Sequence, residues 1–409
     1  MKILVLNAGS SSQKNALYEI TGDSLPGQAS TPLWEASIDW SHQAGRAEVK
    51  VQTATGATYQ NSLETESRSE AVTQVLATLW QGETKVIETP TQIDAVGHRV
   101  VHGGQHYRQS VVVTAQVKAA IAELAALAPS HNPANLVGIE AVEAVLGTDV
   151  PQVAVFDTAF HSQIPEAAAL YPLPHSWVEQ GIRRYGFHGI SHGYCAQRAA
   201  QILNRELQDL RLIICHLGNG CSLSAVSGGH SVDTTMGFTP LDGLMMGTRS
   251  GSVDPGILIH ILRTQNISVE TLDRLLNKES GLKGISGVSG DMRQIQSAIA
   301  DGNSRAQLAF DIYIHRLRRS IGAMLASLNG LDALVFTAGV GENAAPVRSA
   351  TCAGLAFLGL QLDATKNQSR PVDQDIAAAE STVRVLVVHT QEDWAIAQEC
   401  WHLLEAFTG

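Results

Sequence analysis

The sequence predicts an α/β protein built from two similar domains, each with a central sheet flanked by helices. Three apolar, strand-like runs each end in a polar turn that contains glycine, at residues 3–6, 212–215 and 333–336. The first two turns, NAGSSS and HLGNGCS, place similar residue types in the same order about half a chain apart, which indicates a duplicated unit. The chain has 409 residues, more than one hydrophobic core usually serves, so two domains are expected.

The composition is that of a globular protein with an acidic balance. Hydrophobic residues make up 44% of the chain, charged residues 16%, and the mean hydropathy is +0.02. The formal net charge of −11 argues against a nucleic-acid partner or an anionic membrane surface, because both repel an acidic protein. An anionic ligand would therefore need a few local arginines to hold it.

The cysteines and the N-terminal residues favour a cytoplasmic location. The five cysteines are scattered, odd in number and without a C-x-x-C pair, so we expect free thiols in a reducing compartment rather than disulfides or a zinc site. The first residues, MKILVLNAGSSS, contain too short an apolar run for a signal peptide. No apolar run approaches the ~18 residues of a membrane-spanning helix, so no membrane partner is expected.

The N-terminal part places Asn7 and Lys14 around the first polar turn. Lys14 follows the serines of this turn and is either within reach of a ligand held there or an ordinary solvated lysine. Residues 22–66 are polar with short alternating stretches, which indicates surface strands or a hairpin excursion. Residues 69–81 have the apolar spacing of a helix.

A strand-like run over residues 93–101 contains Arg99 and ends at two glycines. A buried arginine is costly without an anionic partner, so Arg99 is predicted to pair with a structural carboxylate or with a carboxylate or phosphate ligand. Two helical patterns lie between this run and a buried strand, 152–156, that ends at Asp157. Open α/β sheets place their sites at such strand ends, although an aspartate there can also cap a helix.

The turn HLGNG, which follows the second strand-like run, has two interpretations. Glycines let backbone N–H groups approach a ligand closely, and a concavity of such groups can cradle a phosphate. Asn-Gly is also a strong signal for an ordinary β-hairpin. The residues of the turn alone leave both interpretations open.

The second half of the chain contains a long loop, a long helix and the third strand and turn. Residues 233–251 are rich in glycine and methionine without a helix or strand period, which predicts a structured loop, either functional or an inter-domain hinge. Another small-residue loop is expected over 284–293 and a long helix over 304–328. Residues 333–343 repeat the strand and glycine turn, and a last strand and helix close the chain.

The turns and arginines together fit a nucleotide-phosphate site of a particular kind. No G-x-x-x-x-G-K-[ST] sequence occurs and the protein-kinase loops are absent, so P-loop and protein-kinase architectures are excluded. A duplicated strand and turn plan that points two loops at one cleft is the design of the superfold of sugar kinases, heat-shock chaperones and actin. We therefore expect duplicated actin-like (ribonuclease H-like) domains with mixed central sheets, flanking helices and a nucleotide cleft between them.

Nine short motifs resemble those of the acetate kinases: NAGSSSQK, GHRVVHGG, PSHNP, VFDTAFH, RYGFHG, HLGNG, DTTMGFTPLDGLMMGTRSG, DMR and AGVGEN. They occur in family order over essentially the whole chain, and the longest is highly specific, whereas HLGNG or AGVGEN alone would be weak. The resemblance implies reversible transfer of the γ-phosphoryl group of ATP to acetate, giving acetyl phosphate and ADP, with Mg²⁺ or alternatively Mn²⁺. It also implies a homodimer. The domains expected are residues 1–152 plus 393–409, and residues 153–392.

The resemblance also implies roles for individual residues. Arg99 would bind the carboxylate substrate, Asp157 is the family's assigned catalytic acid/base, and His188 and Arg249 would stabilise the phosphoryl group in transit. Magnesium contacts are implied for Asn7 and Glu392. Nucleotide contacts are implied for Lys14, His216, Leu217, Gly218, Asn219, Gly220, Asp291, Met292, Arg293, Gly339, Val340, Gly341, Glu342 and Asn343. A pocket for the methyl group of the acid is implied for Val101, Ser130, Phe187 and Pro240.

The acid/base role of Asp157 conflicts with the chemistry of the substrate. A carboxylate substrate is already ionised at neutral pH, so the forward reaction offers Asp157 no proton to remove. Our hypothesis is that Asp157 orients Arg249 or a magnesium-bound water instead of acting as a base.

Ser130 departs from the family pattern, which usually has leucine in the corresponding PLHNP motif. A hydroxyl makes the pocket side chain smaller and more polar, so propionate or another short-chain acid stays open as the substrate, because one methylene discriminates by only ~1–3 kcal/mol. The alternative from another class is a non-catalytic ATP-binding protein of the actin-like or chaperone-like kind. Such a protein would not need Arg99, His188 and Arg249 together.

Overall fold

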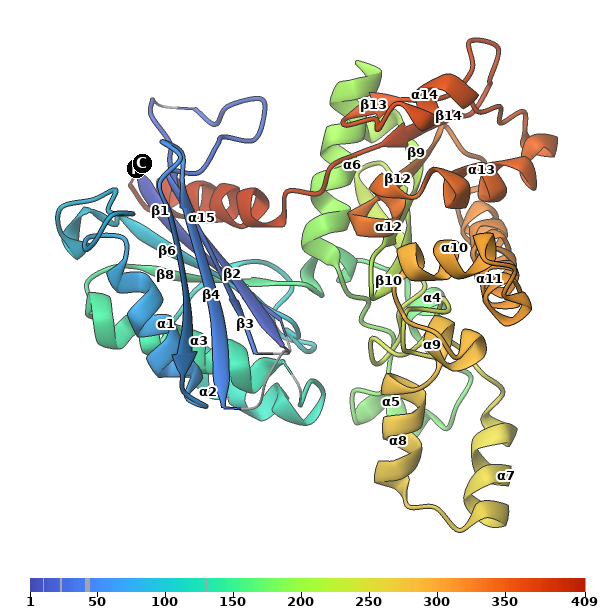
Figure 1. The fold of residues 1–409 in the computed structure, drawn as a ribbon, viewed down its shortest axis with the longest axis horizontal. Coiled ribbons are helices and arrows are strands. Elements are labelled where there is room, and N and C mark those ends of the chain that lie inside the picture. The colour runs from blue at the N-terminus through green and yellow to red at the C-terminus, as the bar shows by residue number, and fades with distance from the viewer. Residues whose placement is uncertain (10, 23, 41–44, 130, 409) are drawn as a thin grey trace. The chain divides into compact units, whose positions relative to one another are not determined.

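The computed structural model of the protein describes residues 1–9, 11–22, 24–40, 45–129 and 131–408. Within these residues the chain divides into two compact units, each with its own sheet and its own hydrophobic core (Figure 1).

The two units are residues 1–159 with 391–409, and residues 160–390. The boundaries expected from the sequence, after residues 152 and 392, would remove strand β8 (Gln152–Phe156) from the first unit. This strand pairs in parallel with β6 (Ala95–Val100), so backbone hydrogen bonds hold it in the first sheet. The crossing between units therefore falls after the strand that carries Asp157 at its end, not before it.

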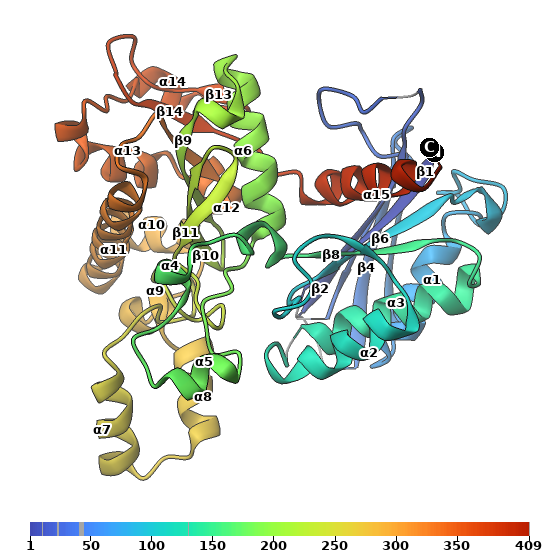
Figure 2. The same cartoon turned by 180° about the vertical axis from the view of Figure 1, so that it is seen from behind.

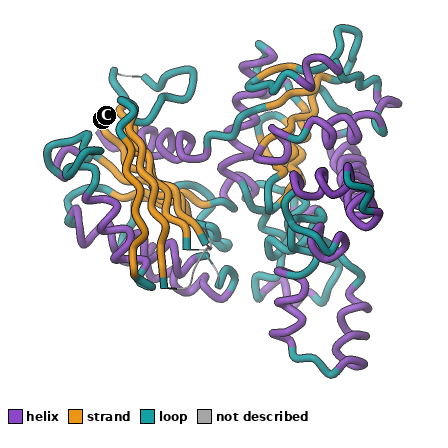
Figure 3. The backbone as a smooth tube through the Cα atoms, in the orientation of Figure 1, coloured by secondary structure: helices purple, strands orange, loops and turns teal. Residues whose placement is uncertain are grey.

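The first unit is built on an eight-stranded mixed sheet in the order β5-β4-β3-β2-β1-β6-β8-β7. Pairs from β5 to β1 are antiparallel, whereas β1, β6 and β8 run parallel to one another. The antiparallel part is visible in Figure 3 as long orange strands. The other strands are β1 (Lys2–Ala8), β2 (Ser12–Glu19), β3 (Trp34–Asp39), β4 (Arg46–Thr53), β5 (Thr58–Glu64) and β7 (Val111–Val112).

Helices cover both faces of the first sheet because its strands alternate apolar side chains between the faces. Leu4 and Leu6 pack into a core with Val75 and Val142, which lie on two helices of one face. On β6, Gly97 leaves room for the helix of the other face, since a Cβ there would lie 2.6 Å from Cys400 Sγ. The helices are α1 (Arg68–Ala77), α2 (Ala115–Glu123), α3 (Asn132–Leu146) and α15 (Glu392–Thr408), with α2 and α3 side by side in Figure 2.

The second unit contains a six-stranded mixed sheet in the order β11-β10-β9-β12-β14-β13. Pairs β11·β10, β10·β9 and β14·β13 are antiparallel, whereas β9, β12 and β14 run parallel. The strands are β9 (Arg211–Leu217), β10 (Cys221–Ser227), β11 (His230–Thr234), β12 (Ala333–Thr337), β13 (Gln374–Asp375) and β14 (Arg384–Val387).

The two sheets share one topology. The order β3-β2-β1-β6-β8 of the first unit repeats as β11-β10-β9-β12-β14 in the second. Strand β1 forms an antiparallel hairpin with β2 and pairs in parallel with β6, and β9 does the same with β10 and β12. The α/β fold with two mixed sheets, expected from the repeated strand and turn plan, is confirmed.

Helices of the second unit pack on the buried residues of its sheet. Ala196 and Ala199, on the helix that begins at Gly189, share a core with Ile214 and Val335. No described helix is both long and apolar enough to cross a membrane. The helices are α4 (Glu166–Ala169), α5 (His175–Glu179), α6 (Gly189–Leu203), α7 (Pro255–Gln265), α8 (Val269–Lys278), α9 (Gly281–Ser286), α10 (Met292–Ala300), α11 (Ser304–Leu328), α12 (Ala338–Asn343), α13 (Ala345–Ala353) and α14 (Ala364–Gln368).

Two segments expected as loops are helical. The nucleotide turn after the third strand, AGVGEN, is the short helix α12, and the small-residue stretch around Gly284 contributes to α9. In both cases the low helix propensity of glycine gives way to tertiary context, because α12 follows a fully buried strand and α9 packs against α11. The long helix α11 occupies the residues expected for it, with the side chain of Asn303 capping its N-terminus.

Candidate active site

The residues implied by the motifs fall into two sets, one in each unit. The first unit holds Asn7, Lys14, Arg99, Val101, Asp157 and Glu392. The second unit holds Phe187, His188, Pro240, Arg249 and the nucleotide segments. Ser130 lies outside the described residues.

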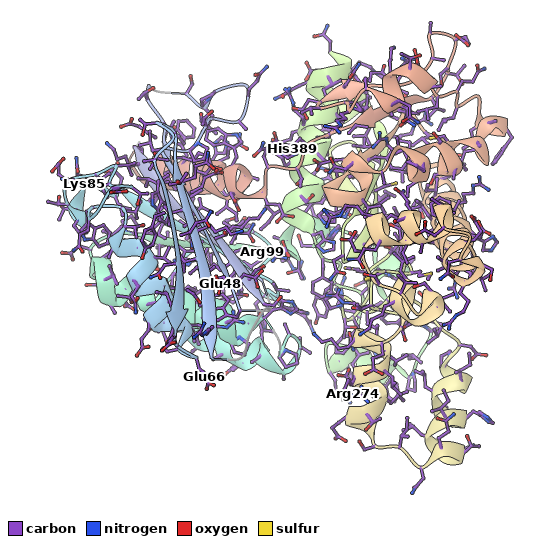
Figure 4. The ribbon with its side chains drawn as sticks, viewed as in Figure 1. Glu48, Glu66, Lys85, Arg99, Arg274 and His389 are labelled. Carbon is purple, nitrogen blue, oxygen red and sulfur yellow. The ribbon has the colours of Figure 1, made fainter. Side chains whose placement is uncertain are left out.

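Arg99 and Asp157 form a buried ion pair at the ends of two neighbouring parallel strands. Nε of Arg99 donates to Oδ2 of Asp157 at 3.0 Å and Nη2 donates to the same oxygen at 2.5 Å. The side chains are 15% and 2% exposed. The pairing arises because strands β6 and β8 are in register, with Val100 beside Phe156, so both side chains leave the same edge of the sheet (Arg99 is labelled in Figure 4).

The ionisation of this pair follows from burial and charge together. Burial raises the pKa of Asp157, and the Arg99 guanidinium opposes that rise. Because an arginine does not lose its proton in a protein, the carboxylate beside it stays charged at neutral pH. The guanidinium has five N–H donors. Two bond Asp157 and one bonds the Ala8 carbonyl, which leaves two for a ligand.

Asn7 connects the first strand to two carboxylates at the start of α15. Its Nδ2 donates to Oε2 of Glu392 at 3.2 Å and to Oδ1 of Asp393 at 2.7 Å. Lys14 is the antiparallel partner of Asn7 on β2 and is exposed. Burial raises the pKa of Asp393, while the hydrogen bond from Asn7 and the charge of Lys14 oppose that rise. Asp393 therefore belongs to the same polar group, although the sequence singled out only its neighbour.

This polar group has the chemistry of a weak magnesium site rather than a metal cage. Within the described part of the chain, no three His, Cys, Asp or Glu residues come together as ligands. Mg²⁺ prefers oxygen donors and is usually held by one or two carboxylates, substrate phosphates and several waters. The carboxylate and amide oxygens of Asn7, Glu392 and Asp393 fit that requirement.

Val101 is held in place by a residue from α3. Its backbone N–H donates to Oδ1 of Asn135 at 3.2 Å, and Nδ2 of Asn135 donates to the Ala8 carbonyl at 3.2 Å. Val101 and Asn135 are 3% and 2% exposed. The buried amide thus ties the ends of β6 and β1 together beneath the residues of the first set.

In the second unit, the turn HLGNG is a tight β-hairpin between β9 and β10. Strand pairing runs from Arg211 with Ser227 up to Leu217 with Cys221, and Gly218 N–H donates to the Gly220 carbonyl at 3.0 Å. The hairpin interpretation is therefore confirmed for the backbone.

His188 and Arg249 approach the tip of this hairpin together. A Cβ on Gly220 would lie 3.5 Å from His188 Nε2 and 3.4 Å from Arg249 Nη1. His188 has φ of 57°, a left-handed conformation that is uncommon for a non-glycine residue and often occurs at functional sites. Its ring stacks on His216 with centroids 4.1 Å apart. An imidazole and a guanidinium therefore lie next to each other at the tip of the hairpin.

Arg249 has an environment suited to an anion. Arg249 is half-buried, and burial lowers its pKa. Among the described residues it makes no ion pair, and Nη1 donates to the Pro240 carbonyl at 3.2 Å. A buried cation without a protein carboxylate gains most from an anionic ligand.

The loop that carries Pro240 and Arg249 is held by Arg184, the first residue of the RYGFHG motif. Nη1 of Arg184 donates to three successive carbonyls, of Thr234, Thr235 and Met236, at 2.9, 2.9 and 3.1 Å. The guanidinium also lies 3.5 Å from Asp242. One cation therefore shapes the start of the long loop. Phe187 of the same motif is 1% exposed.

Three of the glycine-rich segments meet at Gly247. Its N–H donates to the Asn219 carbonyl at 3.1 Å, and its carbonyl accepts from Lys283 N–H at 3.0 Å. A Cβ on Gly247 would lie 2.9 Å from the Gly290 carbonyl oxygen. The hairpin tip, the long loop and the segment before Asp291 are thus packed against one another with no room for a side chain.

The DMR motif begins α10. Asp291 caps this helix by accepting from Arg293 N–H at 2.8 Å, and its carboxylate pairs with the Arg293 guanidinium at 2.6 Å. The side-chain hydrogen bond from Arg293 lowers the pKa of Asp291. Met292 is buried, whereas Arg293 is 89% exposed and can turn to a ligand without a desolvation cost.

The AGVGEN segment is held by a buried arginine that the sequence did not single out. Nη1 of Arg348 donates to the carbonyls of Gly341 and Glu342 at 2.8 and 2.7 Å, and Nε donates to Oδ1 of Asn367 at 2.7 Å. Arg348 is 1% exposed. It therefore satisfies the last carbonyls of α12 and neutralises the negative end of that helix. The remaining residues of α12 have mixed exposure: Gly339 and Asn343 are exposed, Gly341 is buried, and Val340 is half-buried.

Comparisons with known proteins show the family of this chain. The family model described as "Acetokinase family" matches residues 2–398. The chain belongs to the acetokinase family. A curated relative from Nostoc punctiforme, named "Acetate kinase", is 65% identical over 405 residues, which is 99% of this chain and 100% of the relative.

Solved structures of family members have the same fold. The acetate kinase of Porphyromonas gingivalis has a TM-score of 0.90 at 40% identity, with 98% of this chain and 99% of that one covered. A propionate kinase from Francisella tularensis has a TM-score of 0.88, also at 40% identity, with the same shares of each chain covered. The fold expected from the motifs is therefore confirmed.

Several residues of the site escaped the sequence-based reasoning. Four residues hold the backbone or the side chains of the two sets, although no role was predicted for them from the sequence: Asp393, Asn135, Arg184 and Arg348. Only Asp393 had a local signal, since it stands next to Glu392 directly after the last strand. The others make their contacts with residues distant in the sequence, which no local pattern reports.

Proposed function

We propose that this protein is an acetate kinase, which transfers the γ-phosphoryl group of ATP to acetate and gives acetyl phosphate and ADP, reversibly. The observation that carries the proposal is the convergence of Arg249 and His188 on Gly220, in a chain that matches relatives named acetate kinase from end to end. A phosphoryl group in transit spreads negative charge over three oxygens, so an enzyme that transfers it mainly positions the reactants and stabilises that charge.

We assign the charge stabilisation to Arg249 and His188. The guanidinium of Arg249 has no carboxylate partner among the described residues and supplies a fork of donors to the phosphoryl oxygens. His188 supplies a ring N–H from Nε2, next to Gly220. Neither side chain needs to move far from its packed position to act, so the stabilisation is preorganised.

The nucleotide contacts are assigned to Lys14, the hairpin His216–Gly220, the DMR motif and α12. The tight packing at Gly247 supports this assignment, since it fixes the hairpin tip and the segment before Asp291 in one geometry. The exposed backbone of Gly339 and the exposed Asn219 offer polar groups to a nucleotide.

Replacing Gly247 with alanine tests this assignment. The new Cβ would press on the Gly290 carbonyl, so we expect KM for ATP to rise about tenfold and the free energy of unfolding to fall by about 1–3 kcal/mol, as in overpacked sites. Gly322→Ala is the control, because nothing lies within 4 Å of its Cβ position on α11 and alanine favours a helix. An unchanged KM for ATP in the Gly247 variant would contradict the assignment.

Arg99 is assigned to the carboxylate of the substrate, and Asp157 to positioning Arg99. The two N–H donors that Arg99 retains can bind one carboxylate bidentately. The hypothesis from the sequence named Arg249 or a magnesium-bound water as the group that Asp157 orients; the partner found within its own unit is Arg99. A base is still not required, because the acid reacts as its carboxylate.

Magnesium, with manganese as the alternative, is assigned to the polar group of Asn7 and Glu392, to which we add Asp393. When bound, the ion would neutralise charge on the nucleotide phosphates. The protein's own contribution is to hold the two carboxylates by the amide of Asn7, which limits their mutual repulsion and keeps their oxygens in place.

A second candidate is a propionate or other short-chain acyl kinase. By resemblance to the family, contact with the methyl end of the acid is assigned to Val101, Ser130, Phe187 and Pro240. Ser130, where the family usually has leucine, leaves the choice of acid open, and one solved structure that is 40% identical to this chain is named a propionate kinase. By resemblance to the family we also propose a homodimer and a cytoplasmic location. We propose no nucleic-acid or membrane partner.

An acyl phosphate assay separates these functions. The purified protein is incubated with ATP, Mg²⁺ and acetate, propionate or butyrate at equal concentration, and the product is trapped with hydroxylamine. We expect the acetyl product in excess, with discrimination of about 10- to 200-fold for one methylene. A faster rate with propionate would identify propionate, not acetate, as the preferred substrate. If none of the acids gives an acyl phosphate, the result supports the non-catalytic ATP-binding alternative.

A further inference from the structure

His188 is connected to a second histidine through a buried hydroxyl. Its Nδ1 lies 2.9 Å from Oγ of Ser222 on β10, and Nε2 of His192 lies 2.7 Å from the same oxygen. His188 stands just before the first residue of α6 and His192 lies in its first turn, where the His192 N–H donates to the His188 carbonyl at 2.9 Å. Ser222 and His192 are fully buried.

The single proton of the Ser222 hydroxyl limits the arrangements of this chain. A hydroxyl donates one hydrogen bond and accepts two. These two histidines are the side-chain partners that the described structure gives Ser222 Oγ. If both rings donated to it, the buried hydroxyl proton would have no acceptor, so the hydroxyl donates to one ring and accepts from the other. Either His192 donates and His188 accepts, or the reverse.

The second nitrogen of His192 decides between the two arrangements. Its Nδ1 is buried and has no hydrogen-bond partner among the described residues. Burial, together with the neighbouring His161 and His216, lowers the pKa of His192 well below its usual value, so the ring is neutral. Placing the proton on Nδ1 would bury an N–H without an acceptor, which is rare in folded proteins. The proton therefore lies on Nε2 and is donated to Ser222.

We propose that Ser222 and His192 are positioning residues that hold His188 as the neutral ring with its proton on Nε2. This inference deepens the proposed function, because it rests on the assigned part of His188 in phosphoryl transfer. Ser222 Oγ accepts a hydrogen bond from the Nε2–H of His192 and donates its own to Nδ1 of His188, which leaves Nε2 of His188 as the protonated nitrogen.

For the reaction, this arrangement gives His188 a hydrogen-bond donor at Nε2 with a fixed orientation and keeps its ring neutral. His188 Nε2 lies beside the Gly220 position that it shares with Arg249 Nη1, so the N–H points to the place assigned to the phosphoryl oxygens. Protonation of His188 at Nδ1 would turn the acceptor of the Ser222 bond into a donor and leave the hydroxyl proton without a partner. The chain thus opposes both the wrong tautomer and the charged ring.

The tautomer can be measured directly in the intact protein. Nitrogen-15 chemical shifts of the histidine rings distinguish Nε2–H from Nδ1–H, and the spectrum of a His188→Asn variant assigns the His188 signals. We expect a protonated Nε2 and an unprotonated Nδ1 on His188 at pH 7. A proton on Nδ1 of His188 in the native protein would overturn the proposal, whatever activity the protein has.

Three variants test the chain itself. In Ser222→Ala and His192→Leu we expect kcat to fall about 10- to 100-fold, with KM for ATP and for the acid nearly unchanged, as found when the partners that orient a functional histidine are removed. His192→Gln, whose amide can donate to Ser222, should recover much of the loss.

Ser224→Ala is the matched control, because Ser224 lies two residues along the same strand, is equally buried and bonds Ser231 Oγ at 3.0 Å instead of a catalytic ring. It should keep kcat within about threefold, as substitutions away from a functional network do. Unchanged kcat in a folded Ser222→Ala, or equal loss in the His192 Leu and Gln variants, would overturn the proposal. Should no acid be phosphorylated by the native protein, the proposed function fails and the tautomer measurement still decides the inference.

Discussion

Replacing Arg249 with leucine is expected to lower kcat by about 10³- to 10⁵-fold, the range measured for arginines that stabilise a phosphoryl group in transit. The physical reason is that its half-buried guanidinium makes no ion pair in the described structure, so its charge is available to the reacting group. Because the charge matters most in the transition state, KM for ATP and for the acid should change little. Steady-state kinetics of acyl phosphate formation measure both parameters.

Two further variants distinguish the effect of losing the Arg249 charge from a nonspecific loss of activity. Arg249→Lys keeps a cation but loses the planar fork, so its kcat should lie between those of the native protein and the leucine variant. Arg263→Leu, on the exposed side of α7, removes an arginine that makes no ion pair with the described residues and should leave kcat unchanged. A leucine variant that retains kcat within about tenfold would remove Arg249 from the assigned role.

Removing Asp157 is expected to lower the free energy of unfolding by about 3–5 kcal/mol, because it leaves the buried Arg99 guanidinium without its counterion. The double variant Asp157→Ala with Arg99→Met should recover most of that loss, since replacing a buried ion pair by apolar groups is often close to neutral. Recovery of stability without recovery of activity would show that the pair is kept for its function. Chemical denaturation of the two single variants and the double variant measures the coupling.

Glu88→Ala is the control for this cycle, because it breaks an exposed ion pair with Lys85 and should cost less than about 1 kcal/mol. Asp157→Asn tests the positioning role by kinetics. If Asp157 orients Arg99, kcat falls and KM for the acid rises at every pH. If the variant instead only removes a carboxyl titration from the rate profile, with metal dependence unchanged, Asp157 acts as a base and our assignment is wrong.

Much of the fold could be predicted from the sequence because the patterns that indicate strands and helices are local. Buried strands appear as short apolar runs, and the residue types after them repeat between NAGSSS and HLGNGCS, which predicted the duplicated sheets that the strand orders confirm. The long helix α11 also has a local signature in its apolar spacing and its capping asparagine. The unit boundary was misplaced because pairing of β8 with β6 depends on a strand more than fifty residues earlier, which local patterns do not report.

The candidate site was predictable to the extent that it consists of motifs. Asn7, Arg99, Asp157 and the hairpin at Gly220 all stand at strand ends, and open α/β sheets place functional groups there. The sequence also left a real ambiguity at Arg99, between a structural carboxylate and a ligand. In the structure Arg99 pairs with a structural carboxylate, that of Asp157, and two of its N–H groups are still available for a ligand.

By itself, then, the sequence determined the α/β class, the repeated strand plan and the residue types that the proposed chemistry needs, since each depends on neighbours along the chain. Only the tertiary structure decided which side chains share a proton or a charge. The pairing of Arg99 with Asp157, the link from His192 through Ser222 to His188, and the hold of Arg348 on α12 all join residues brought together by strand register and helix packing. Hydrogen bonds require atoms within about 3 Å, and that proximity is a property of the packed core rather than of any single segment.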